Sequence, residues 1–164
     1  MRHNMHSWVR LALLLAFPAC ANAGGGGAMP DAVSRPSATA SPAEARTEID
    51  RMMTRAAAAW TRGDLEAFMS DYLDSDSTTY IGGNRLIRGK AAIRDVYAPR
   101  FAPGGVRDSL SFEGLEVDLL APGIAHTIAF YVLSRGDSVV ARGPTSLLMR
   151  QVGGRWLIVH DHSS

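Results

Sequence analysis

Four long segments of β-strand character follow one another in the second half of the sequence. They cover residues 110–120, 124–134, 138–151 and 155–162, and short turns that contain glycine separate them. Long strands joined by such short turns predict a meander, in which each strand runs antiparallel to the strand before it. A sheet of this kind buries one face against another layer, so the preceding part of the chain has to supply that layer.

The part of the chain that precedes the strands has the pattern of helices. Ser41-Pro42-Ala43-Glu44 combines a capping box with proline at the first helical position, which predicts the start of a helix. Apolar residues recur at helical spacing from Ile49 to Trp60, and Gly63 is suited to end this helix in a left-handed conformation. Asp64 can cap a second, shorter helix over residues 65–72.

A short hairpin and a third helix are expected between these helices and the meander. Residues 78–81 and 85–88 have strand character, and Gly82-Gly83-Asn84 between them is a turn signal. Gly89 begins a third helix, which one of the following prolines ends. Helices followed by a run of strands predict the α+β class, with the helices packed on one face of a curved sheet.

The N-terminal segment, residues 1–23, has the pattern of a secretory signal peptide. Arg2 and Arg10 are positively charged, residues 11–17 form an unbroken apolar run, and Ala21-Asn22-Ala23 fits the small-x-small pattern of a cleavage site. The apolar run is too short for a transmembrane helix, which needs about 20 residues. We therefore expect an exported protein, either periplasmic or secreted.

Cys20 leaves two interpretations open for this leader. Phe17-Pro18-Ala19-Cys20 is similar to a bacterial lipobox, in which the cysteine is lipidated and anchors the protein to a membrane. Phe17 and Pro18 depart from the usual pattern, and the alternative is a cysteine that is removed with the signal peptide. Because the sequence contains one cysteine, both interpretations exclude a disulfide within the domain and thiol catalysis.

The segment of residues 24–43 consists mostly of Gly, Ala, Ser and Pro, which is typical of a flexible linker. The expected folded domain then covers residues 44–164. The 17 Lys and Arg residues are balanced by 16 Asp and Glu residues, so the chain lacks the basic excess of a nucleic-acid-binding protein. The sequence contains no phosphate loop, dinucleotide fingerprint or nucleophile elbow, and no cofactor is expected.

Four stretches of this sequence carry a resemblance to a known superfamily. They are residues 59–68 (AWTRGDLEAF), 80–83 (YIGG), 88–89 (RG) and 154–164 (GRWLIVHDHSS). Together with the order of helices, hairpin and strands, they resemble the SnoaL-like branch of the nuclear transport factor 2-like superfamily, close to the calmodulin-dependent kinase II association domain and to SgcJ/EcaC-type proteins. The resemblance implies a cone-shaped fold whose curved sheet encloses a pocket, and a homodimer formed through the opposite face of the sheet.

The last predicted strand contains two histidines and a carboxyl group. Strict alternation places four side chains on one face: Trp156, Ile158, His160 and His162. Asp161 lies on the opposite face. The histidines can carry protons near neutral pH or bind a metal, but a metal needs a third ligand and only His126 remains in the domain, so no metal site is expected. The alternative is that this ending hydrogen-bonds the last strand to its neighbours and lines a pocket.

Three residues are candidates for catalysis: Asp161, His160 and Tyr80. Asp161 is a general base if its face is the pocket face, since an apolar environment raises the pKa of a carboxyl group; the alternative is a carboxylate that faces solvent or pairs with arginine. Tyr80 lies beside the glycine turn, and in ketosteroid isomerase relatives a tyrosine hydroxyl stabilises the oxyanion of an enolate. The alternative is a core tyrosine whose hydroxyl lies at the rim of the pocket.

Six further residues are candidates for contact with a ligand: His162, Arg88, Tyr97, Tyr131, Arg142 and Trp60. Arg88 or Arg142, reaching into an apolar pocket, would bind a carboxylate with two hydrogen bonds. The alternative is that both arginines point outward. The expected partner is therefore a small apolar compound or a carboxylate.

Two functions remain open on these observations. The first is a ligand-binding or assembly domain that uses the pocket for a small molecule or the sheet for a partner. The alternative is a cofactor-free acid/base enzyme, of the isomerase, cyclase or dehydratase type, that acts on an apolar carbonyl compound. A buried carboxyl group with a raised pKa in the pocket would favour the enzyme, whereas a pocket with only arginine and histidine would favour the binding domain.

Overall fold

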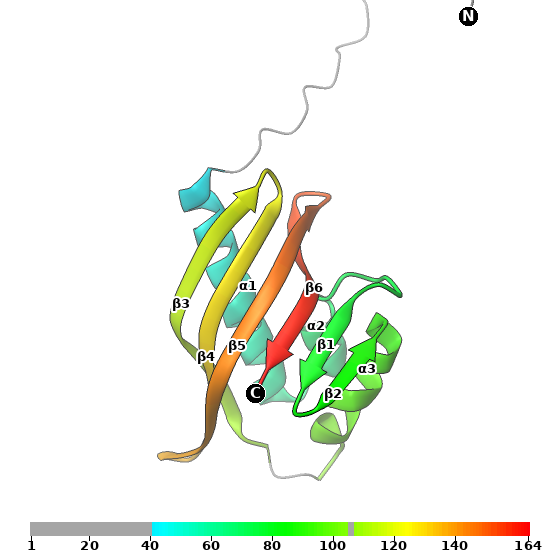
Figure 1. Cartoon of the computed structure of the whole chain (residues 1–164). Helices are drawn as coiled ribbons and strands as arrows, with labels where there is room; N and C mark the ends of the chain where they lie inside the picture. The colour runs from blue at the N-terminus through cyan, green and yellow to red at the C-terminus, as the bar shows by residue number, and fades with distance from the viewer. Residues whose placement is uncertain (1–40, 105–106) are drawn as a thin grey trace, which may run out of the picture. The chain divides into compact units, whose positions relative to one another are not determined.

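The computed structural model of the chain describes residues 41–104 and 107–164. The predicted signal peptide, the lipidation candidate Cys20 and the predicted linker up to residue 40 lie outside the described residues. The helices are α1 (Pro42–Arg62), α2 (Leu65–Met69), α3 (Lys90–Tyr97) and the 3₁₀ helix η1 (Ala98–Phe101). The strands are β1 (Thr79–Gly82), β2 (Arg85–Arg88), β3 (Ser109–Ala121), β4 (Ile124–Arg135), β5 (Ser138–Val152) and β6 (Arg155–Ser163) (Figure 1). No helix in this described part is long and apolar enough to cross a bilayer.

The six strands form one sheet in the order β2-β1-β6-β5-β4-β3. Strands β3 to β6 make the predicted antiparallel meander, and α1 packs behind it (Figure 1). The predicted α+β class, with N-terminal helices on one face of a curved sheet, is confirmed. One pair departs from the antiparallel pattern, because the β1–β2 hairpin joins the sheet beside β6 with β1 parallel to β6.

The boundaries of α1 are fixed by the two caps that the sequence predicts. The backbone N–H of Ser41 donates to Glu44 Oε2 at 2.8 Å, and the N–H of Glu44 donates to Ser41 Oγ at 3.3 Å, which completes the capping box. Gly63 ends the helix with φ of 76°, a left-handed conformation that favours glycine. α1 therefore begins at Pro42, before the expected start of the domain at residue 44.

The apolar stripe of α1 is buried against the sheet and forms much of the core. Its buried residues are Ala45, Ile49, Met52, Met53, Ala56 and Ala59. From the sheet, Ala125, Leu147, Met149, Trp156 and Ile158 pack into the same cluster. The core therefore lies between α1 and one face of the meander, which leaves the other face of the sheet outside it.

A β-bulge in β6 changes which side chains face the helices. On β5, Leu148 pairs with His160 while its neighbour Met149 pairs with Ile158, so Val159 is an extra residue in β6. Ile158 and Asp161 are both buried, at 5% and 3% exposure. The prediction that His160 and His162 share the face of Trp156 and Ile158 is wrong, because the extra residue shifts the alternation by one position.

Replacing Ile49 by Ala is expected to destabilise the protein by about 2–5 kcal/mol, because the site is fully buried and the substitution leaves a cavity. Val139 is 62% exposed, so Val139→Ala is the matched control and should change the free energy of unfolding by about 0.5 kcal/mol or less. Urea unfolding of both variants of the whole chain measures the difference. Equal effects of the two substitutions would contradict the assignment of the core.

Candidate functional site

A cavity of about 600 Å³ lies between the helices and the sheet. Every helix and strand contributes at least one side chain to its lining, and most of these side chains are apolar. The sequence contains four tyrosines, and all of them line the cavity: Tyr72, Tyr80, Tyr97 and Tyr131. The cavity therefore combines apolar walls with a small number of hydroxyl groups, and Asp161 is placed among these.

Asp161 is held by three hydroxyl groups. The Tyr72 hydroxyl donates to Asp161 Oδ2 at 2.6 Å, and the Tyr97 hydroxyl donates to the same oxygen at 3.3 Å. The Ser163 hydroxyl donates to Oδ1 at 2.7 Å and is itself 2.9 Å from Thr145 Oγ1. Among the residues that the structure describes, no arginine or lysine forms a salt bridge with Asp161. The carboxyl group is thus stabilised by neutral donors rather than by a cation.

These partners come together from three separate segments. Asp161 and Ser163 are two residues apart on β6 and point to the same side, Tyr72 follows α2, and Tyr97 is the last residue of α3. Tyr72 also forms an isolated parallel bridge with Ile158, and this bridge brings the chain after α2 against β6. The position of β6, together with its bridge to Tyr72, therefore determines where the Asp161 carboxyl group meets the hydroxyl groups that donate to it.

Burial raises the pKa of Asp161, and the hydrogen bonds from Tyr72, Ser163 and Tyr97 only partly oppose this effect. Burial, followed by the nearby charge of Asp161, raises the pKa values of Tyr72 and Tyr97 well above the ordinary value for tyrosine. These phenols stay protonated at neutral pH and can act only as neutral groups. The alternative interpretation of Asp161, a carboxylate that faces solvent or pairs with an arginine, is wrong, because β6 turns the side chain inward.

Tyr80 occupies the position next to this cluster. In the parallel pair of β1 and β6, Tyr80 lies opposite Asp161, and its ring centroid is 5.4 Å from that of Tyr97. Burial and the charge of Asp161 raise the pKa of Tyr80, so its hydroxyl keeps its proton at neutral pH. Because its side chain is only half-buried, this hydroxyl can donate a hydrogen bond to a molecule in the cavity.

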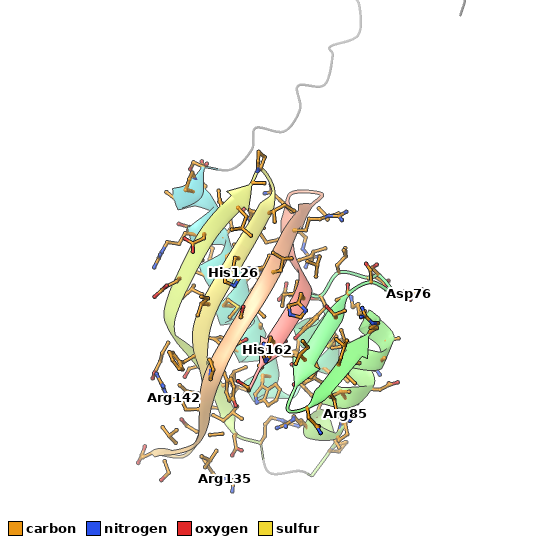
Figure 2. All side chains as sticks on the ribbon, in the orientation of Figure 1. Asp76, Arg85, His126, Arg135, Arg142 and His162 are labelled. Carbon is orange, nitrogen blue, oxygen red and sulfur yellow. The ribbon has the colours of Figure 1, made fainter. Side chains whose placement is uncertain are left out.

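The histidines of β6 lie outside the cavity lining. His160 Nδ1 is 2.7 Å from Thr79 Oγ1, and His162 is exposed. His126 is also on the outer face, where its Nε2 is 2.9 Å from Ser146 Oγ (Figure 2). Among the described residues, no three or more His, Cys, Asp or Glu side chains lie together in a way that could hold a metal ion.

The two predicted arginines also lie outside the cavity lining. Arg142 points to the outer face of the sheet, where its Nε donates to Glu113 Oε2 at 3.3 Å and its guanidinium carbon lies 3.9 Å from the centroid of the Phe130 ring (Figure 2). Arg88 is exposed on β2, one residue out of phase with Ile87, which does line the cavity. Of the candidate residues, the structure therefore brings together Asp161, Tyr80, Tyr97, Tyr131 and Trp60 at the cavity.

Several cavity residues with polar side chains are absent from the sequence-based candidates, among them Tyr72, Arg85, Arg100 and Ser163. Ser163 could have been found by its spacing of two from Asp161, and Arg85 by its spacing of two from Ile87. The sequence predicts Tyr72 on the second helix, but α2 ends at Met69 and the following turn directs Tyr72 to Asp161. Arg100 lies in the short 3₁₀ helix η1, where no periodic pattern of the sequence indicates which side chains face the cavity.

A SnoaL-like domain model matches residues 49–164 of this chain. The chain belongs to the SnoaL-like domain family. This confirms the resemblance that the sequence carries, and the folds of solved structures agree with it. No sequence among curated proteins matches the chain.

Several solved structures have the same fold and can be superposed on most of the length of this SnoaL-like chain. An NTF2-like protein of unknown function from Shewanella oneidensis is 25% identical, with a TM-score of 0.65, over 72% of this chain and 97% of its own. A proposed dehydratase of the NTF2-like family from Streptomyces avermitilis is 17% identical, with a TM-score of 0.65, over 76% and 97%. A proposed calcium/calmodulin-dependent protein kinase type II association domain from Thiobacillus denitrificans is 20% identical, with a TM-score of 0.60, over 69% and 90%.

Asp161→Asn is expected to remove a pH dependence from the stability of this SnoaL-like domain. The folded protein binds the Asp161 proton more tightly than the unfolded chain does. The free energy of unfolding of the wild type should therefore fall as the pH rises from 3.8, the ordinary pKa of the carboxyl group, to above the raised pKa of the folded state. At higher pH, Asp161 should cause no further change in this free energy. Asp161→Asn cannot ionise, so its stability relative to the wild type should increase over the same interval.

Urea unfolding of both proteins at a series of pH values from about 4 to 8 measures this difference. The comparison between the two proteins cancels the titration of all other groups, including Asp71, whose pKa burial also raises. A stability difference that is independent of pH, or that falls as the pH rises, would contradict the raised pKa of Asp161.

Proposed function

We propose that this protein is a cofactor-free acid/base enzyme that moves a proton on a small carbonyl compound with a largely apolar body. Asp161 accepts and returns the proton, and Tyr80 donates a hydrogen bond to the carbonyl oxygen. The observation that supports the proposal most is the buried Asp161 carboxyl group, held by three hydroxyls in the wall of a largely apolar cavity. A carboxyl group with a raised pKa in the cavity favours the enzyme over the binding domain.

The raised pKa of Asp161 suits it to abstract a proton from carbon. A carboxylate of ordinary pKa is a weak base, and a base works best when its pKa approaches the working pH. In the proposed step, one Asp161 oxygen takes a proton from the carbon next to the carbonyl group. The electron pair of the broken C–H bond forms a C=C bond with the carbonyl carbon, and the π electron pair of the carbonyl group moves onto its oxygen, which becomes an enolate oxyanion.

Tyr80 is suited to stabilise that oxyanion. Its hydroxyl is protonated at neutral pH, it lies on the strand paired with Asp161, and its side chain is partly accessible from the cavity. A donor of this kind acts most strongly on the charge that develops in the transition state. Return of the proton to a different carbon would give an isomerase, and departure of a neighbouring hydroxyl group as water would give a dehydratase.

A second function, ligand binding without turnover, is favoured by one specific observation. Both oxygens of Asp161 already accept hydrogen bonds from Tyr72, Tyr97 and Ser163, so a ligand has to compete for the remaining lone pairs. In that case the tyrosines and Asp161 form a polar end to the cavity that orients a ligand. If the protein is an enzyme, Asp161→Asn abolishes its reaction. If the protein only binds a ligand, it has no reaction to lose, and Asp161→Asn leaves binding unchanged.

Proton exchange on 2-tetralone, a small apolar ketone, tests the enzyme directly. The wild-type chain should accelerate exchange of the protons next to the carbonyl group for deuterium in D₂O, followed by NMR. Asp161→Asn should slow the catalysed exchange by about 100-fold or more, because it removes the base. Tyr80→Phe should slow it by about 100-fold, because it removes an oxyanion donor.

His162→Gln is the matched control for this experiment. His162 is on the same strand as Asp161 but is exposed and does not line the cavity, so this variant should exchange at the wild-type rate. Exchange by the wild type no faster than in buffer, or exchange that survives in Asp161→Asn, would contradict the enzyme.

We also propose that the domain is exported and forms a homodimer through the outer face of the sheet. Ile128 and Phe130 are 39% and 37% exposed on this face of β4.

Light scattering of the eluted whole chain should give a dimer for the wild type and a monomer for Phe130→Glu, because the charge cannot be buried at an apolar interface. Ala91→Glu, at an exposed position of the helix α3, is the control and should remain a dimer. A wild-type monomer would exclude this interface.

A further inference from the structure

Two arginines line the cavity where it meets solvent. Arg85 is the first residue of β2, directly after the turn that contains Gly83 (Figure 2). Arg100 lies in η1. Gly83, Arg85 and Arg100 are exposed although they line the cavity, whereas Tyr72, Tyr97 and Asp161 are buried in its wall. The hydroxyl and carboxyl groups are thus in the interior of the cavity, and the guanidinium groups are at its opening.

Neither of these arginines forms a salt bridge with a described residue. Six other arginines of this part of the chain do: Arg55, Arg62, Arg94, Arg135, Arg142 and Arg155. The guanidinium carbon of Arg100 lies 5.9 Å from the centroid of the Trp60 ring, which also lines the cavity. Burial raises the pKa of Tyr80, and the positive charge of Arg100 opposes this rise.

The acidic groups of the lining do not neutralise these arginines. Asp71 pairs with Arg55 at 3.8 Å and with Arg155 at 3.5 Å, on the side of α1 and β6. Asp161 is held in the interior by hydroxyl groups. A cationic ligand would be repelled at the opening, whereas an anionic group would be attracted to it.

We propose that Arg85 and Arg100 bind a carboxylate of the ligand, and that the ligand is an amphipathic organic acid. Its carboxylate lies at the opening of the cavity, and its apolar body lies between α1 and the sheet. Guanidinium groups bind carboxylates through paired, charge-assisted hydrogen bonds. This assignment rests on the proposed function only in treating the cavity as the site, and it extends that function by placing the carboxylate at the opening and the reacting carbonyl group deeper, toward Asp161. The arginines determine the orientation of the ligand, and Asp161 acts on its buried end.

Binding of 1-naphthylacetate and of 1-naphthylacetamide tests this proposal. The two compounds share an aromatic body and differ in charge, and calorimetry with the whole chain measures both dissociation constants. The wild type should bind the acid about tenfold more tightly than the amide, a factor that corresponds to about 1.4 kcal/mol. In the double variant Arg85→Gln/Arg100→Gln the two affinities should become equal, because the acid loses affinity while the amide keeps it.

Arg88→Gln is the matched control variant. Arg88 lies on the same strand as Arg85, is exposed and does not line the cavity, so this variant should keep the preference for the acid. Equal affinities of the wild type for acid and amide, no binding of the acid, or a preference that survives in the double variant would each overturn the proposal.

Asp161→Asn separates this inference from the proposed catalysis. If the wild type prefers the acid but does not catalyse exchange on 2-tetralone, the carboxylate site stands and the enzyme fails. If exchange depends on Asp161 but acid and amide bind equally, the enzyme stands and the carboxylate site fails. The preference for the acid should be retained in Asp161→Asn, because binding at the opening requires no proton transfer.

Discussion

The pairing of β6 with two neighbours is the constraint on which the site depends. β6 is bonded to β5 on one side and to β1 on the other, so its register fixes which side chains of three strands face the helices. The extra residue Val159 turns Asp161 inward, and the parallel pairing with β1 places Tyr80 opposite it. Without the bulge, strict alternation would direct Asp161 outward and leave the cavity without a carboxyl group.

Burying that carboxyl group is unfavourable, and the surrounding structure reduces the cost in a specific way. An arginine beside Asp161 would hold its pKa low and make it a poor base. Three hydroxyl donors satisfy its oxygens without supplying a full charge, so the pKa of the carboxyl group stays raised. The same arrangement places Tyr72 and Tyr97, which keep their protons, between the carboxyl group and the aromatic side chains of α1 and α2.

Most of the fold could be predicted from the sequence because its signals are local. The capping box at Ser41, the glycine at residue 63 and the long strands with short turns each act within a few residues. The parallel pairing of β1 with β6 and the bulge at Val159 are long-range consequences of packing and have no signature in the sequence. For this reason the sequence predicts the wrong face for His160 and His162 and does not show that Tyr72 meets Asp161.

The gathering of all four tyrosines at one cavity has an optical consequence. In most proteins the near-ultraviolet absorption of tyrosine averages over phenols scattered across the molecule. Here Tyr72, Tyr80, Tyr97 and Tyr131 line the same cavity, some of them buried and some partly exposed, so every phenol band reports on this one cavity. The tyrosines are therefore natural chromophores of the cavity. A difference spectrum in the near-ultraviolet region records a molecule that enters or leaves the cavity, and no label is needed.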